Sequence, residues 1–226
     1  MISRDNYNKI YENALIHIES AELLAAGEKY GIAISHLILG IEEFIKYHVV
    51  IANSTELNVF PDKEFEAVFR SHERKHELLK EFQTSICAES SEAFQRLILK
   101  NQSKQPLTDE ESKIKANRFK EIGNILYAAF SENLSKSEFD DFFVWMNDVN
   151  DLKNQGFYVG FQNGIWKIPS DKTKAEYERA LSYAKVIQKQ TSLTKDLDMT
   201  DDEFMTMLNT EVGELPGTFD ELAGDK

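Results

Sequence analysis

The segment IAISHLILGIEEFIKYHVVIA, residues 32–52, is apolar on nearly every side of a helix. A helix on the surface of a protein keeps one polar face, whereas a helix that is apolar all round is covered on several sides. The sequence therefore predicts a helical protein built around this segment as its central helix. Three charged residues in its middle, Glu42, Glu43 and Lys46, are then expected to need partners, because charge is costly to bury alone.

Most of the remaining chain also has the periodicity of helices. Apolar side chains recur at spacings of three and four, Pro61 suits the first turn of a helix, and Thr108–Glu111 fits a capping box. We expect further helices at about residues 5–26, from Pro61 continuously through Cys87, from Thr108 onward, at 136–153, at 172–190 and, short, near 200–209.

One segment has a different period. In GFYVGFQNGIWKIP, β-branched and aromatic residues flank Asn163-Gly164, which is the strongest short signal for a β-hairpin. We expect the hairpin at about residues 157–168. It is too short to be stable unaided, so Phe157, Phe161 and Trp166 should pack on the bundle or on a partner.

These elements together predict an all-α fold, a helical bundle of five to six helices with one short β-hairpin. No repeat or linker divides the body, so we expect one domain over residues 1–190. Residues 191–226 contain ten acidic residues against two lysines, so we expect them to form an acidic C-terminal appendage.

The charge and the cysteine content limit the class of protein. A net charge of −13 excludes a general nucleic-acid binder, so contact with RNA would need a local basic patch. Arg70, Arg74, Lys75 and Lys80 form the densest one. The one cysteine, Cys87, excludes a disulfide within the chain and suggests a reducing, cytoplasmic setting. The N-terminus lacks the layout of a signal peptide and no apolar run is long enough to span a membrane, so we expect no membrane association.

The stretch RSHERKHELLKEF, residues 70–82, contains a possible zinc-protease pattern. His72-Glu73-Arg74-Lys75-His76 spells H-E-x-x-H, in which two histidines one turn apart bind zinc. A third ligand is not evident, because no histidine follows His76, and two cations between the histidines would oppose a divalent metal. We therefore predict neither a metal site nor a cofactor.

The same stretch also has a helical face. At about 100° per residue, His72, Lys75 and His76 lie on the apolar side of the helix, and Arg70 points away from it. Each histidine could be a satisfied core group, but three polar groups on one apolar stripe all need partners when buried. We expect His72 and Lys75 to converge with Glu42, Glu43 and Lys46 of the central helix, with His76 at the edge and Arg70 reaching in from a neighbouring surface.

Three segments in order, AAGEKYGIAISHLILGIEEFIK, HERK and LKNQGFYVGFQNGIWKIP, resemble landmarks of the AbiV family of abortive infection proteins. The landmarks are an EE-x-x-K segment, an H-x-x-K pair and a late segment with Gly, an apolar residue, Tyr and Val before a Trp and a Pro. The chain departs from the family at Lys153, where an Arg is usual, and at Gly160, where an Asp commonly follows Tyr-Val.

The resemblance implies a bacterial, cytoplasmic antiphage protein with a fold akin to HEPN domains, and a homodimer. In HEPN ribonucleases an Arg and a His converge at the cleft between two protomers and cut RNA without metal, and Arg70-x5-His76 matches that pattern. Arg70, His76 and His72 are thus the candidate catalytic residues. The candidate binding residues are Glu42, Glu43, Lys46, Lys75, Lys153 and Tyr158. The alternative is a non-enzymatic antiphage protein that sequesters a host or phage protein, and a phage or host protein could also be the trigger.

Overall fold

The computed structural model describes residues 4–53, 62–87, 128 and 134–196. Six α-helices and one hairpin lie in these ranges: α1 (Arg4–Ala26), α2 (Tyr30–Asn53), α3 (Asp62–Arg70), α4 (His72–Cys87), α7 (Lys136–Phe157), β1 (Gly160–Gln162), β2 (Ile165–Lys167), the short 3-10 helix η1 (Pro169–Asp171) and α8 (Lys174–Asp196). The predicted all-α class with one short hairpin is confirmed. The helices expected from Thr108 and near 200–209 lie outside the described residues.

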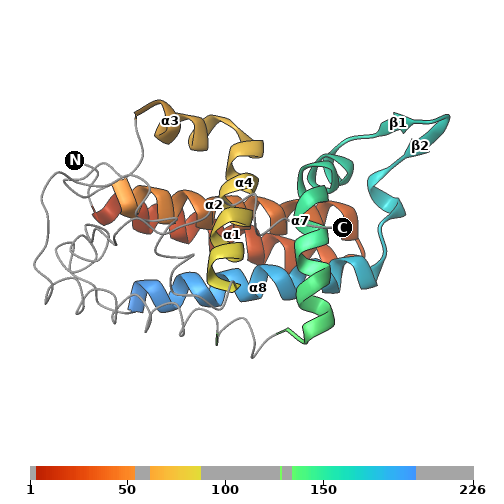
Figure 1. Cartoon of the computed structure of the whole chain (residues 1–226). Helices are drawn as coiled ribbons and strands as arrows, with labels where there is room; N and C mark the ends of the chain where they lie inside the picture. The colour runs from red at the N-terminus through yellow and green to blue at the C-terminus, as the bar shows by residue number, and fades with distance from the viewer. Residues whose placement is uncertain (1–3, 54–61, 88–127, 129–133, 197–226) are drawn as a thin grey trace, which may run out of the picture.

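Helix α2 is the centre of the bundle, as its apolar sequence predicts. It packs against α1, α7, α8, α4 and α3, and Figure 1 shows it crossing the middle of the molecule between the other helices. The apolar faces of these helices pack around α2 and form the core. The largest fully buried side chains of the core include Phe44, Tyr47, Phe142 and Tyr183. A residue on almost any side of α2 is therefore at least partly buried, and the charged Glu42 is buried completely.

The expected single helix from Pro61 through Cys87 is instead two helices. Helix α3 ends at Arg70, Ser71 is not helical, and α4 starts at His72. The Ser71 hydroxyl accepts a hydrogen bond from the Arg74 backbone N–H at 3.2 Å, so it satisfies one of the free N–H groups at the start of α4. Figure 1 shows the chain changing direction between α3 and α4. Helical periodicity continues through the break and therefore hides it.

Helix α7 crosses the start of α2 at very close range. A Cβ atom on Gly156 would lie 1.9 Å from Ser35 Oγ and 2.2 Å from the Gly31 carbonyl oxygen. The Ser35 hydroxyl also donates to the backbone carbonyl of Lys153 at 2.7 Å. This contact of small residues holds the last two turns of α7 against α2.

Helix α8 extends six residues past the expected boundary at 190. It ends at Asp196, and Thr191 is buried in the bundle. The His48 imidazole lies 3.1 Å from the Thr191 hydroxyl, and Ser192 shares a 2.8 Å hydrogen bond with Tyr11. The remainder of the acidic segment, residues 197–226, is outside the described residues.

The hairpin forms where Asn163-Gly164 predicts it. These two residues have φ values of 54° and 79°, the left-handed conformation that a tight two-residue turn requires. Phe157 packs its ring against His36, with centroids 5.8 Å apart. Phe161 and Trp166 do not pack on the bundle, contrary to one of the two expected arrangements, since both side chains are exposed and contact each other.

None of the described helices is both long enough and apolar enough to cross a membrane.

Candidate functional site

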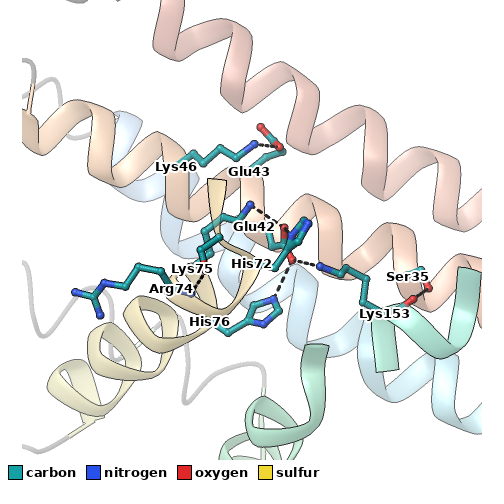
Figure 2. A network of polar contacts seen from close by, with 10 residues as sticks. Ser35, Glu42, Glu43, Lys46, His72, Arg74, Lys75, His76 and Lys153 are labelled. Carbon is teal, nitrogen blue, oxygen red and sulfur yellow. Dashed lines mark hydrogen bonds and ion pairs between the residues drawn. The ribbon is translucent and has the colours of Figure 1, made fainter. Parts of the chain in front are cut away.

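One buried carboxylate organises the polar interior of the bundle. Glu42, in the middle of α2, is only 1% exposed. His72 Nδ1 lies 2.5 Å and Lys75 Nζ 3.0 Å from its Oε2 atom, while His76 Nε2 lies 3.0 Å and Lys153 Nζ 2.9 Å from its Oε1 atom. Figure 2 shows these four side chains converging on Glu42 from α4 on one side and α7 on the other. We call the five residues the Glu42 cluster.

The geometry of α4 explains why three members come from one short stretch. His72, Lys75 and His76 are spaced by three and four residues, so they project from one face of the helix, and that face lies against α2. The predicted helical face is therefore correct. The break at Ser71 makes His72 the first residue of α4, at the edge of the cluster nearest to solvent.

Glu42 is held in its ionised form. Burial alone would raise the pKa of this carboxyl, but hydrogen bonds from His76 and Lys153 and the charges of Lys75 and Lys153 lower the pKa well below its ordinary value. Burial in turn lowers the pKa of Lys153, and the hydrogen bond to Glu42 opposes that effect. The buried part of the cluster is thus one carboxylate between two ammonium groups.

The two histidines of the cluster differ in their access to solvent. The His76 side chain is buried, whereas half of the His72 side chain surface is exposed. The Nδ1–H group of His72 donates to the ionised carboxylate, so the neutral form of this imidazole carries its lone pair on Nε2. An imidazole oriented in this way, at the surface and backed by a carboxylate, has the arrangement of a general base.

Two predicted members lie apart from the cluster. Glu43, one residue after Glu42, is rotated by about 100° on α2 and forms an ion pair with Lys46 instead. Figure 2 shows this pair on another side of α2 from the cluster. The Lys46 ammonium also lies 6.0 Å from the centre of the Phe69 ring. Glu43 and Lys46 therefore form a partly buried ion pair outside the Glu42 cluster.

Arg70 does not reach the cluster. It ends α3, its side chain is 79% exposed, and it pairs with Glu66 at 3.1 Å. Tyr158 lies at the C-terminal cap of α7 and is exposed at the root of the hairpin. The predicted residues that the structure brings together are therefore Glu42, His72, Lys75, His76 and Lys153.

Each cation of the basic patch predicted around Arg70 contacts an acidic or polar side chain. Arg70 pairs with Glu66, Arg74 with Glu77 at 3.1 Å, Lys75 with Glu42, and Lys80 donates to Asn147 at 2.9 Å. Each cation of the patch is thus neutralised or hydrogen-bonded nearby.

The sequence pattern does not connect Lys153 to Glu42, because 111 positions separate them. The resemblance to the family is the signal that singles out Lys153. Ser35, which positions Lys153 through its backbone, was not predicted at all, since one serine on an apolar helix carries no recognisable pattern.

The H-E-x-x-H pattern does not assemble a metal site in the described part of the chain. No group of three or more His, Cys, Asp or Glu side chains is placed there to hold a metal ion. His72 and His76 direct one nitrogen each at Glu42, and the ammonium groups of Lys75 and Lys153 occupy the same carboxylate.

The family model HEPN_AbiV, described as AbiV, matches residues 2–189. No curated protein and no solved structure matches the chain.

Proposed function

Since the chain belongs to the AbiV family of HEPN-type proteins, we propose that it acts in abortive infection by cutting RNA without a metal, with His72 as the general base. Membership in the family indicates an antiphage role. The ribonuclease activity is our proposal for how that role is carried out. The observation that carries it is the half-exposed imidazole of His72, held through Nδ1 by the buried carboxylate of Glu42.

The chemistry follows from the position of the free lone pair. His72 Nε2 accepts the proton of a ribose 2′-hydroxyl, the 2′ oxygen attacks the adjacent phosphorus, and the bond to the 5′ oxygen breaks. The leaving oxygen takes a proton from water. The Glu42 carboxylate stabilises the imidazolium that forms, as a buried acid does for a catalytic histidine elsewhere.

A cation is needed to stabilise the charged phosphorane-like transition state. Arg70 is two residues from His72, and its guanidinium is on the surface. Its pair with Glu66 is an exposed ion pair, and such pairs contribute roughly 0–1 kcal/mol, so releasing Arg70 toward a phosphate costs little. The guanidinium can come from the same protomer or from a second one. His76 is assigned to positioning, because it is buried against Glu42.

One observation favours the second candidate, a protein that sequesters another protein without catalysis. The cations near His72 are already paired with acidic side chains, as for Arg70 with Glu66 and Arg74 with Glu77, so the surface offers RNA little net positive charge. In that case the Glu42 cluster would stabilise the fold only.

Incubation of RNA with purified protein in the presence of EDTA separates the two functions. We expect total cellular RNA to be cut into discrete fragments by the wild type and to stay intact with His72→Gln. His36→Gln is the control, because His36 is a partly exposed histidine that lies outside the Glu42 cluster.

Folding of each variant is checked by circular dichroism, and antiphage protection is scored in parallel. Intact RNA with a folded wild-type protein that still protects cells would reject the ribonuclease and support the binder. Cleavage by His72→Gln at the wild-type rate would reject the assignment of His72.

A further inference from the structure

The Glu42 cluster contains more positive charge than negative charge. The ionised carboxylate is shared by two ammonium groups, with Lys75 Nζ 3.0 Å from Oε2 and Lys153 Nζ 2.9 Å from Oε1. Among the described residues, Glu42 is the only carboxylate that forms an ion pair with either lysine. With both histidines of the cluster neutral, two positive charges and one negative charge leave a net charge of +1.

This excess charge lies inside the protein. The exposed fractions of the side chains are 3% for Lys75, 5% for Lys153 and 1% for Glu42. A charge surrounded by protein is screened less than a charge in water, and it is costly without a counter-charge. Burial lowers the pKa of Lys153, and so does the nearby charge of Lys75, as expected for two cations that share one carboxylate. The cluster is therefore a buried source of positive potential.

The charged side chains around the cluster do not offset this potential. Most of them form ion pairs that are neutral as a whole, namely Arg70 with Glu66, Arg74 with Glu77 and Lys46 with Glu43. Glu73, next to His72 on α4, is exposed, so solvent and salt screen its charge. In the described part of the chain, the excess positive charge near His72 thus comes from the buried lysines and not from the surface cations.

The potential reaches solvent at His72. Half of the His72 side chain is exposed, whereas the other four members of the cluster are 10% exposed or less. Figure 2 shows the His72 ring beside Glu42, with Lys75 and Lys153 approaching the carboxylate from opposite sides. An anion at the exposed edge of His72 is therefore separated from the charged centre of the cluster by a single imidazole ring.

We propose that the exposed edge of His72 binds a phosphate group, which is held there by the excess positive charge of Lys75 and Lys153. The phosphate supplies the negative charge that balances the cluster. This inference rests on the proposed function, in which the group is the phosphodiester of RNA next to the attacking 2′-hydroxyl. His72 Nε2, after it takes the proton of that hydroxyl, can donate it in a hydrogen bond to a phosphate oxygen.

The two lysines act on the phosphate through charge and not through contact, because both are buried. They are positioning residues in this sense, and His72 is the group that touches the anion. A fixed positive charge next to the phosphorus also stabilises the phosphorane-like transition state, in addition to the contribution of Arg70.

Inorganic phosphate is the probe for this site. Compared with chloride at equal pH and ionic strength, about 50 mM phosphate should raise the thermal midpoint of the wild type by roughly 2–5 °C. In NMR spectra, phosphate should shift the imidazole resonances of His72, which are assigned by their loss in His72→Gln. The resonances of His36, which lies outside the cluster, should not shift.

The variant Lys153→Met tests the role of the charge. It leaves Glu42 paired with Lys75, so the buried part of the cluster becomes neutral and the variant should fold. We expect its affinity for phosphate to be lower by about tenfold, whereas Lys153→Arg retains the charge and should retain the affinity. Lys75→Met makes the same change of charge at the other oxygen and replaces Lys153→Met if that variant does not fold. Lys80→Met removes an exposed cation from α4 and is the control.

A short 2′-O-methyl RNA oligonucleotide distinguishes RNA from free phosphate as the ligand, because it cannot be cut by its own 2′ oxygen. It should displace inorganic phosphate from His72. Phosphate that binds at His72 but is not displaced would support the anion site and contradict the ribonuclease function. Phosphate that shifts neither the thermal midpoint nor the His72 resonances overturns the proposal, and so does equal phosphate affinity of the wild type and a folded Lys153→Met or Lys75→Met variant.

Discussion

Glu42 is the buried carboxylate on which four polar side chains of the bundle converge. Glu42 and Glu43 are adjacent and alike in sequence, yet one is buried among four cationic or imidazole groups and the other pairs with Lys46. The sequence predicts that the central helix carries charges in need of partners, and the face of α4 predicts which histidines and lysine meet them. The sequence does not predict which of the two carboxylates contacts α4 and α7, because that depends on how α4 and α7 are rotated against α2.

At the residue scale, we predict that Glu42→Gln strongly destabilises the fold. The change removes the buried negative charge but leaves the ammonium groups of Lys75 and Lys153 buried, and breaking a buried pair costs about 3–5 kcal/mol. Urea denaturation measures the free energy of unfolding. The matched variant Glu43→Gln removes only one side of a half-buried pair and should cost about 1 kcal/mol or less. Equal losses for both variants would contradict the central place given to Glu42.

At the scale of elements, the periods of the sequence predict most of the fold. Helical spacing locates α1, α2 and α8, and Asn163-Gly164 locates the hairpin. The break at Ser71 is not predicted, because the apolar stripe of α3 and α4 has the same period on both sides of it. The exposure of Phe161 and Trp166 is not predicted either, since strand alternation shows that a face is apolar but not what covers it.

The close crossing of α7 over α2 is testable by adding one methyl group. We expect Gly156→Ala to destabilise the protein by about 1–3 kcal/mol, because the new Cβ meets Ser35 Oγ at 1.9 Å and backbone at 2.2 Å. Thermal unfolding should show a lower midpoint. Gly160→Ala is the control, as its Cβ would meet only the Lys167 side chain, at 4.0 Å. Equal unfolding midpoints for the two variants would contradict the close contact between α7 and α2 at Gly156.

At the scale of the whole molecule, several buried groups make stability depend on pH. Burial lowers the pKa of His48 to about 4 and also lowers the pKa values of His17 and His36. A histidine whose folded pKa is below its unfolded value of about 6.5 stabilises the fold fully above that value. The stabilisation is lost as the pH falls from about 6.5 toward the folded pKa. The protein should therefore weaken in mild acid, before its carboxylates titrate.

The variant His48→Gln tests this. Its amide can still donate to the Thr191 hydroxyl but does not titrate. Between about pH 7.5 and pH 5, we expect the wild type to lose roughly 2 kcal/mol more unfolding free energy than the variant. Denaturation curves at the two pH values give the difference. Parallel losses in the two proteins would show that His48 is not the group responsible.

The chemistry of the cut ends of RNA tests the ribonuclease site most directly. A defined RNA oligonucleotide is incubated with wild-type protein in EDTA, and the products are identified by mass spectrometry. Attack by the 2′ oxygen, with His72 as the base, predicts fragments that end in a 2′,3′-cyclic phosphate and begin with a 5′-hydroxyl. The His72→Gln variant should give none of them. Intact RNA with the wild type, or fragments with 5′-phosphate ends that disappear in EDTA, would contradict the assignment of His72 and Glu42 as a metal-independent ribonuclease site.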